Sequence, residues 1–195
     1  MTTGWITPFL EARAAEAGAA RNTLLGYQRD LKDFCGWLAR KGTDPQTATQ
    51  DQVEAYLVSC ADDGLAPATR ARRLSSIRQF FAFAFEEGLR EDNPALTIKG
   101  PSRARRLPKT LSEQDVDRLL QAARDLGKTR ALRLRNTCLM ELLYATGMRV
   151  SELVSLPIAA ARGDPEMLLV RGKGDKERLV PLSRPARAAL HEWLD

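Results

Sequence analysis

Two cations in the second half of the sequence occupy positions from which a side chain can contact a phosphate. Arg149 follows a glycine that should end a helix, in A-T-G-M-R-V-S-E-L, and its guanidinium can donate two parallel hydrogen bonds to phosphate oxygens. Lys173 lies between two glycines at the predicted tip of a hairpin, where its ammonium can supply a proton or a positive charge. Taken alone, each residue is more simply explained as a solvated surface cation.

A helix predicted over residues 67–88 carries a second group of cations. Its apolar stripe, which should place it at the centre of a core, comprises Leu74, Ile77, Phe81, Ala84 and Phe85. On the opposite face we expect Arg72, Ser76 and Gln79, with Thr69 and Arg70 in the first turn and Arg73 and Arg78 flanking the stripe. No acidic residue interrupts residues 66–85. Hydroxyls beside guanidinium groups favour phosphate and base-edge contacts, and a solvated face is the alternative.

The net charge of +5 over 195 residues is concentrated in one short segment. Residues 97–110 contain five basic and no acidic side chains, and Gly100, Pro101 and Pro108 oppose helix formation there. This composition predicts a basic linker between two folded units. Such a linker suits a polyanion that both units bind, since neutralised phosphates release counterions. A linker that is merely solvated is the alternative.

The composition is that of a soluble protein, with 28% charged and 44% hydrophobic residues. No apolar run approaches the roughly 18 residues of a membrane helix, and Glu11, Arg13 and Glu16 oppose a signal peptide. We therefore expect a cytoplasmic protein that does not bind membranes.

The cysteine and histidine content argues against a disulfide framework and a metal site. Cys35, Cys60 and Cys138 are far apart and form no C-x-x-C motif, so we expect buried, reduced thiols. His191 is the single histidine, which excludes chemistry that needs two imidazoles. We expect no metal ion.

Periodicity and capping signals predict a mainly helical chain with one small antiparallel hairpin. Before the linker, helices are expected over residues 7–18, 22–42, 49–64 and 67–88. After it, helices are expected from Ser112, over 134–147, over 150–156 and from Ser183, with strands over 167–170 and 178–182. Thr49 with Gln52, and Ser112 with Asp115, have the spacing of capping boxes.

Several segments resemble one known family in their order along the chain. A-T-G-M-R-V-S-E-L at 145–153, followed by R-G-K-G-D-K-E-R-L-V-P-L at 171–182, is similar to the catalytic domain of tyrosine site-specific recombinases and integrases, in particular the XerC/XerD branch. N-T-L-L-G-Y-Q-R-D-L at 22–31, A-R-R-L-S-S-I-R-Q-F-F at 71–81, G-L-R-E-D-N-P at 88–94 and L-P-K-T-L-S at 107–112 also resemble that family.

The resemblance implies a fold, an activity and roles for individual residues. It implies a helical, SAM-like core-binding domain over residues 1–96, a linker over 97–110, and the first part of an α+β catalytic domain over 111–195, which together close around double-stranded DNA. Arg149 would hold the scissile phosphate, and Lys173 would be the general acid toward the leaving 5′ hydroxyl. The residues expected at the DNA are Asn22, Thr23, Thr69, Arg70, Arg73, Ser76, Arg78, Lys99, Arg103, Arg105 and Arg106.

The same resemblance implies strand exchange through a 3′-phosphotyrosyl intermediate without a nucleotide cofactor. It further implies that a second recombinase subunit, or further copies of the chain, assemble on the DNA. For the XerC/XerD branch it includes roles in chromosome partition and cell division.

Part of the family's machinery has no match in this sequence. The H-x-x-R pair is missing, because Leu194 stands three residues after His191, and no tyrosine follows Tyr144. Tyr27, Tyr56 and Tyr144 have the register of core residues rather than of a nucleophile. We therefore expect a C-terminally shortened recombinase that binds DNA without cleaving it and exposes apolar surface. The alternatives are a non-enzymatic DNA-binding regulator or inhibitor of recombination sites, and a helical protein-interaction module.

Overall fold

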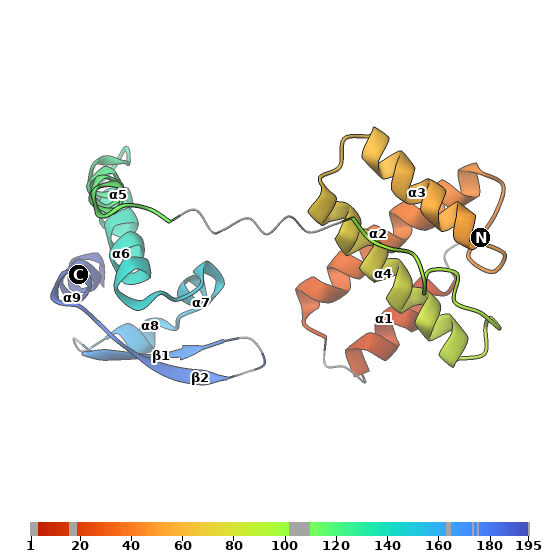
Figure 1. Ribbon diagram of the computed structural model, residues 1–195. Coiled ribbons are helices and arrows are strands. Elements are labelled where there is room, and N and C mark those ends of the chain that lie inside the picture. Colours follow the sequence, from red (N-terminus) through yellow and green to blue (C-terminus); the bar gives the residue numbers. More distant parts are fainter. Residues whose placement is uncertain are drawn as a thin grey trace. The chain divides into compact units, whose positions relative to one another are not determined.

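A computed structural model describes residues 4–15, 19–101, 110–162, 165–172, 174 and 176–194 (Figure 1). The chain divides into two compact units, Met1–Arg106 and Leu107–Asp195, and this division falls inside the segment predicted as the linker. Four residues that the sequence marks as functional lie outside the described residues: Arg103, Arg105, Arg106 and Lys173.

The described residues of the first unit form four helices, as the sequence predicts. These are α1 (Ile6–Ala15), α2 (Arg21–Arg40), α3 (Gln50–Asp62) and α4 (Pro67–Glu86). The start of α3 has the expected capping box: Thr49 accepts a hydrogen bond from the backbone of Gln52, whose side chain accepts one from the backbone of Thr49. Helix α4 begins with proline at its first position, where the missing backbone N–H costs no hydrogen bond.

Aromatic rings fill the core of this unit around α4, which packs against the other three helices. Phe9 of α1 makes edge contacts with Phe80 and Phe83 of α4, each with 5.7 Å between ring centroids. Phe34 of α2 contacts Phe81 in the same geometry at 6.0 Å. The expected central position of α4 is therefore confirmed.

Two residues of α4 do not lie where its periodicity predicts. Ser76 was expected on the polar face, yet it is buried, because α2 packs here and Asp30 of α2 accepts the hydrogen bond of its hydroxyl. Phe85 was expected in the apolar stripe, but it lies in the last turn of the helix and is exposed. The predicted apolar stripe therefore faces the core as expected, except for Phe85 at its end.

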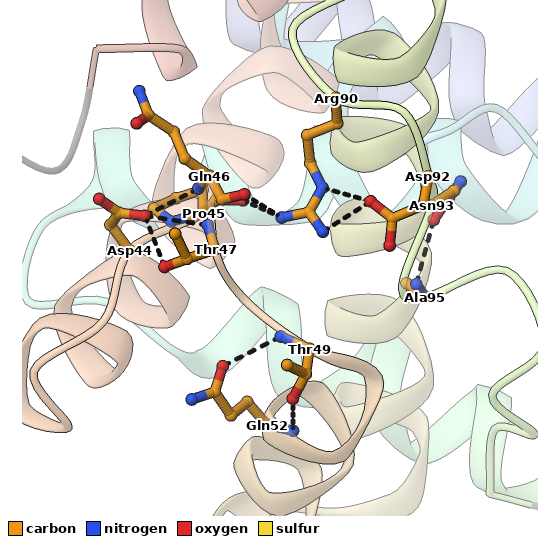
Figure 2. Close-up of polar contacts among 10 residues, drawn as sticks. All are labelled: Asp44, Pro45, Gln46, Thr47, Thr49, Gln52, Arg90, Asp92, Asn93 and Ala95. Atoms are coloured by element: carbon orange, nitrogen blue, oxygen red, sulfur yellow. Dashed lines mark hydrogen bonds and ion pairs between the residues drawn. The ribbon is translucent and has the colours of Figure 1, made fainter.

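One arginine fixes the chain that leaves α4 to the loop between α2 and α3 (Figure 2). The guanidinium of Arg90 donates hydrogen bonds to the backbone carbonyls of Pro45 and Gln46, at 2.7 and 2.6 Å. On its other side it donates two hydrogen bonds to one oxygen of Asp92, at 2.9 and 2.7 Å. It also lies over the ring of Phe81. Arg90 is therefore a structural residue of the domain.

The second unit combines helices with one hairpin. Its helices are α5 (Glu113–Asp125), α6 (Arg130–Thr146), α7 (Val150–Val154), α8 (Ile158–Ala161) and α9 (Arg184–Leu194). Helix α6 packs against α5 on one side and α9 on another. Strands β1 (Met167–Arg171) and β2 (Glu177–Pro181) pair antiparallel (Figure 1). The predicted fold, mainly helical with a small antiparallel sheet, is confirmed.

The hairpin has one buried and one exposed apolar face. Leu168 and Val180 pair across the strands and are buried against the helices. Leu169 and Leu179 form the neighbouring pair and are exposed, because side chains alternate between the faces of a strand. The expected exposure of apolar surface is therefore present on this sheet face.

Burial of the cysteines and tyrosines follows the expectations with one exception. All three cysteines are buried and free. Tyr56 is buried and Tyr27 packs against the first core, but Tyr144 is largely exposed. The core position expected for Tyr144 is wrong, because its side chain on α6 stays 64% exposed.

The described parts of the chain contain neither a membrane-spanning helix nor a cluster of metal-binding side chains. None of the helices described there is both long and apolar enough to cross a membrane. Among the same residues, no group of three or more histidine, cysteine, aspartate or glutamate side chains is arranged to hold a metal ion.

Candidate functional site

The turn between α6 and α7 places Arg149 at the start of a short helix. Gly147 ends α6 in the left-handed conformation, with φ of 60°, which a residue with a side chain adopts at a cost. Thr146 donates its hydroxyl to the carbonyl of Leu142 and accepts the N–H of Met148, at 2.6 and 3.3 Å. Met148 is buried. These contacts fix the backbone that carries Arg149 into α7.

Glu152 holds Arg149 by its backbone and by its side chain. One carboxylate oxygen, Oε2, accepts the backbone N–H of Arg149 at 2.8 Å. The other, Oε1, accepts Nη1 of the guanidinium at 2.9 Å. The carboxylate is 4% exposed, whereas the Arg149 side chain is 70% exposed. Glu152 therefore holds one nitrogen of the guanidinium, while most of the Arg149 side chain stays exposed to solvent.

A second arginine, Arg178 on the hairpin, also pairs with Glu152. Arg178 of β2 donates from both terminal nitrogens to the two carboxylate oxygens, at 3.1 and 2.7 Å. The hydrogen bonds from Arg178, and then that from the backbone of Arg149, lower the pKa of Glu152 to about 2. One ionised carboxylate thus faces two guanidinium groups, and the site carries a net positive charge suited to a phosphate.

The hairpin approaches Glu152 through a glycine. A β-carbon placed on Gly172 would lie 3.2 Å from Oε1 of Glu152, so a side chain there would crowd the carboxylate. The N–H of Gly172 donates to the carbonyl of Lys176 at 2.7 Å and closes the loop. We call Arg149, Glu152, Gly172 and Arg178 the Arg149 cluster. Lys173, the next residue along the chain, lies outside the described residues, and its role stays a prediction.

In the first unit, carboxylates of α2 meet arginines of α4 where these helices pack. Oδ2 of Asp30 accepts hydrogen bonds from Arg72 and from the hydroxyl of Ser76, the latter at 2.8 Å. One turn further along α2, Asp33 pairs with Arg73. Tyr56 of α3 bonds to both members of that pair, accepting from Arg73 at 2.8 Å and donating to Asp33 at 2.7 Å. We call these six residues the helix-crossing network.

The other residues predicted at the DNA are distributed over the first unit. Asn22 and Thr23 are exposed in the first turn of α2. Arg70 and Lys99 line one surface groove between α3, α4 and residues 97–101. Thr69 is partly buried beside Arg70.

Arg78 is bound within its own unit. Its guanidinium donates to the backbone carbonyls of Ala95, at 3.1 Å, and Ile98. These contacts hold the segment after α4 against that helix. That Arg78 contacts DNA stays a prediction, and the contacts observed here hold its own domain together.

Two members of the Arg149 cluster, Glu152 and Arg178, were not among the residues predicted from the sequence. Glu152 stands three residues after Arg149, a spacing that places both on one side of a helical turn and could have indicated the pair. Arg178 is 26 positions from Glu152, and only the hairpin register brings it close. It had no comparable local signal.

Matches to known proteins cover both units. Residues 6–88 match the N-terminal SAM-like domain of phage integrases, and residues 109–195 match the phage integrase family. The tyrosine recombinase XerD of Caulobacter vibrioides is 46% identical over 190 residues, which cover 97% of this chain and 62% of the relative. The XerD of Brucella suis is 47% identical over 197 residues, with 97% and 63% covered. The chain belongs to the phage integrase family of tyrosine recombinases.

Solved structures of tyrosine recombinases share this fold. The XerH recombinase bound to a palindromic difH substrate superposes with a TM-score of 0.75 at 18% identity, covering 97% of this chain and 67% of XerH. The lambda integrase tetramer bound to a Holliday junction gives a TM-score of 0.70 at 23% identity, covering 98% and 54%. The chain spans just over three fifths of the length of its XerD relatives.

Proposed function

We propose that these 195 residues are part of a site-specific DNA recombinase that cleaves and rejoins strands through a phosphotyrosyl intermediate. The Arg149 cluster is the main structural support for this proposal. In it, the buried and ionised Glu152 orients the exposed Arg149 beside the end of a hairpin. The 46% identity to a tyrosine recombinase supports the same reaction. Phosphoryl transfer gains most from groups that are positioned before the reaction and stabilise developing negative charge.

In the proposed mechanism, Arg149 binds the scissile phosphate through the part of its guanidinium that Glu152 leaves accessible. Lys173 adjoins Gly172, which approaches the same carboxylate, and it would donate a proton to the leaving 5′ hydroxyl. These roles require no nucleotide cofactor.

For the remaining parts of the chain we propose residues 1–96 as a DNA-binding domain, 97–110 as a basic linker and 111–195 as the first part of the catalytic domain. The proposed partners are double-stranded DNA and a second recombinase subunit, or another copy of the chain, on that DNA. The proposed location is the cytoplasm.

The 195-residue chain by itself should bind DNA without cutting it. It contains neither an H-x-x-R motif nor a tyrosine after Tyr144, so the family's nucleophile has no counterpart in this sequence. Cleavage would then require residues that this sequence does not contain.

The test uses a nicked suicide duplex that carries a recombination site of the XerD relatives. We expect the 195-residue chain to shift this duplex in a native gel, and we expect no covalent protein–DNA adduct after denaturation. Arg149→Ala should still shift the duplex, with an affinity about eight-fold lower at 0.1 M salt, because a single phosphate contact is lost. An adduct would overturn the proposed lack of a nucleophile, and absence of any shift at low salt would overturn the proposed DNA binding.

A further inference from the structure

Arg72 and Arg73 are neighbours in the sequence, but their guanidinium groups have different surroundings. Arg73 is 19% exposed and its Nη1 bonds to both Asp33 and Tyr56. Its charge is thus neutralised among side chains of its own domain. Arg72 is 43% exposed and bonds to Asp30 through Nη1. The Arg72 side chain is therefore more than twice as exposed as that of Arg73, while Nη1 of its guanidinium is held by Asp30.

The carboxylate that holds Arg72 is buried at a cost. Asp30 is 1% exposed, and while its Oδ2 accepts from Arg72 and Ser76, its Oδ1 is buried with no hydrogen-bond partner among the described residues. A buried carboxylate with one unsatisfied oxygen destabilises a fold relative to a satisfied or apolar group of the same size. The burial of this carboxylate is offset through Oδ2 alone, which holds Arg72 and Ser76.

Arg72 lies on an exposed face of α4 with other polar side chains. Ser75 and Gln79 follow it at spacings of three and seven residues, which place all three on one side of the helix, and all three are exposed. Guanidinium, hydroxyl and amide groups are those that contact phosphates and base edges. This face, rather than the buried Ser76, is the polar face of α4.

We propose that Asp30 is a positioning residue for DNA binding. It holds one nitrogen of Arg72 so that the exposed side chain of this arginine binds a phosphate of the duplex. Arg73, by contrast, stabilises the domain through Asp33 and Tyr56. This inference rests on the proposed DNA binding and assigns its phosphate contact on α4 to one of two adjacent arginines.

The adjacent arginines provide a matched pair of variants in the full 195-residue chain. Affinity for a fluorescent duplex is measured by anisotropy between 50 and 200 mM salt. Arg72→Ala should lower the affinity about eight-fold at 0.1 M salt and reduce the slope of log K against log salt by about 0.9, the contribution of one phosphate contact. Arg73→Ala should leave that slope unchanged and lower the melting temperature instead. The reverse pattern would overturn the assignment.

A double-mutant cycle tests the role of Asp30. Asp30→Asn should lower the affinity of the wild-type chain, yet change it by less than about two-fold when Arg72 is already alanine. If Asp30 acted only by repelling DNA, its neutralisation would raise the affinity, and if its role were only structural, the melting temperature would fall without a change of slope. Either result would overturn the proposal. Asp33→Asn is the control, since Asp33 pairs with Arg73, and it should not lower the affinity.

A second variant covers the case in which Asp30→Asn does not fold. Ser76→Ala removes the other hydrogen bond that fixes the carboxylate and leaves the charge unchanged. It should lower the affinity in the wild-type background alone, and an equal loss in the Arg72→Ala background would overturn the proposal. If the wild-type chain binds no duplex, the proposed function fails. If it binds and Arg72→Ala has no effect, only the positioning of Arg72 fails.

Discussion

The carboxylate of Glu152 accepts a hydrogen bond from the backbone of Arg149 at 2.8 Å and another from its guanidinium at 2.9 Å. The backbone contact caps α7, and the side-chain contact orients the cation, so the same residue starts the helix and aims the arginine. Since Arg178 satisfies both carboxylate oxygens from the hairpin, the hairpin and α7 are fixed to each other through Glu152.

The pKa of Glu152 predicts acid sensitivity in the second unit. Hydrogen bonds from Arg178 and the Arg149 backbone lower this pKa from 4.5 to about 2 in the folded chain. A lowered carboxyl pKa stabilises the fold fully above the unfolded value of 4.5, and this stabilisation is lost as the pH falls toward 2. Denaturant titrations should therefore show that Glu152→Gln is less stable than wild type at pH 7 and that the difference shrinks between pH 4.5 and 2. A difference that is constant with pH would contradict the ion pair.

The backbone conformations of Gly147 and Gly26 predict opposite effects of alanine substitution on stability. Gly147 has a positive φ, so Gly147→Ala should destabilise the second unit by about 1–2 kcal/mol. Gly26 lies inside α2 with open space around its α-carbon, so Gly26→Ala should stabilise the first unit by about 0.5–1 kcal/mol. Thermal unfolding followed by circular dichroism measures both, and equal signs for the two variants would refute the assigned backbone conformation.

How far the sequence predicts this fold depends on the range of the interactions involved. Helix starts were predictable because Thr49 with Gln52, and Ser112 with Asp115, act over three residues. The burial of Ser76 was not, because it depends on Asp30, 46 residues away, where α2 packs on α4.

The candidate sites follow the same rule. Arg149 was found from its local context after a helix-ending glycine. Arg178 contacts Glu152 only once the hairpin forms. The helical wheel placed Arg72 opposite the apolar stripe and Arg73 beside it, but it could not show which carboxylates of α2 pair with them. Residue type and spacing therefore identified the cations, and only the structure separates exposed from internally paired ones.

The contacts of Arg90 predict a loss of stability when its side chain is replaced by alanine (Figure 2). Arg90→Ala would leave the carbonyls of Pro45 and Gln46 without their donor, and it would remove the pair with Asp92. We expect a loss of about 1–3 kcal/mol in the free energy of unfolding, mainly because the part-buried carbonyl of Pro45 loses its donor, whereas Gln46 and Asp92 are exposed to water. Arg40→Ala is the matched control, because Arg40 is exposed in the last turn of α2 and should change stability by less than about 0.5 kcal/mol. Similar losses for both variants in urea titrations would argue against the contacts of Arg90.

The buried cysteines predict protection from thiol reagents. Burial raises the pKa of Cys35 to about 12 and that of Cys138 to about 11, so neither forms the reactive thiolate at neutral pH. Cys60 is buried as well, and its sulfur accepts a hydrogen bond from Arg73 at 3.3 Å. Mass spectrometry after brief iodoacetamide treatment at pH 8 should show no labelled thiol in the native chain and three in guanidinium chloride. Rapid labelling of any native cysteine would contradict its burial.

The salt dependence of duplex binding by the 195-residue chain tests the proposed function most directly. If the exposed arginines bind phosphates at six to ten positions, log K should fall linearly with log salt, and the affinity should drop by about 10³–10⁵ between 50 and 200 mM. An anisotropy titration that finds no binding at 50 mM salt, or binding whose strength does not change with salt, would contradict the assignment of this chain as the DNA-binding part of a recombinase.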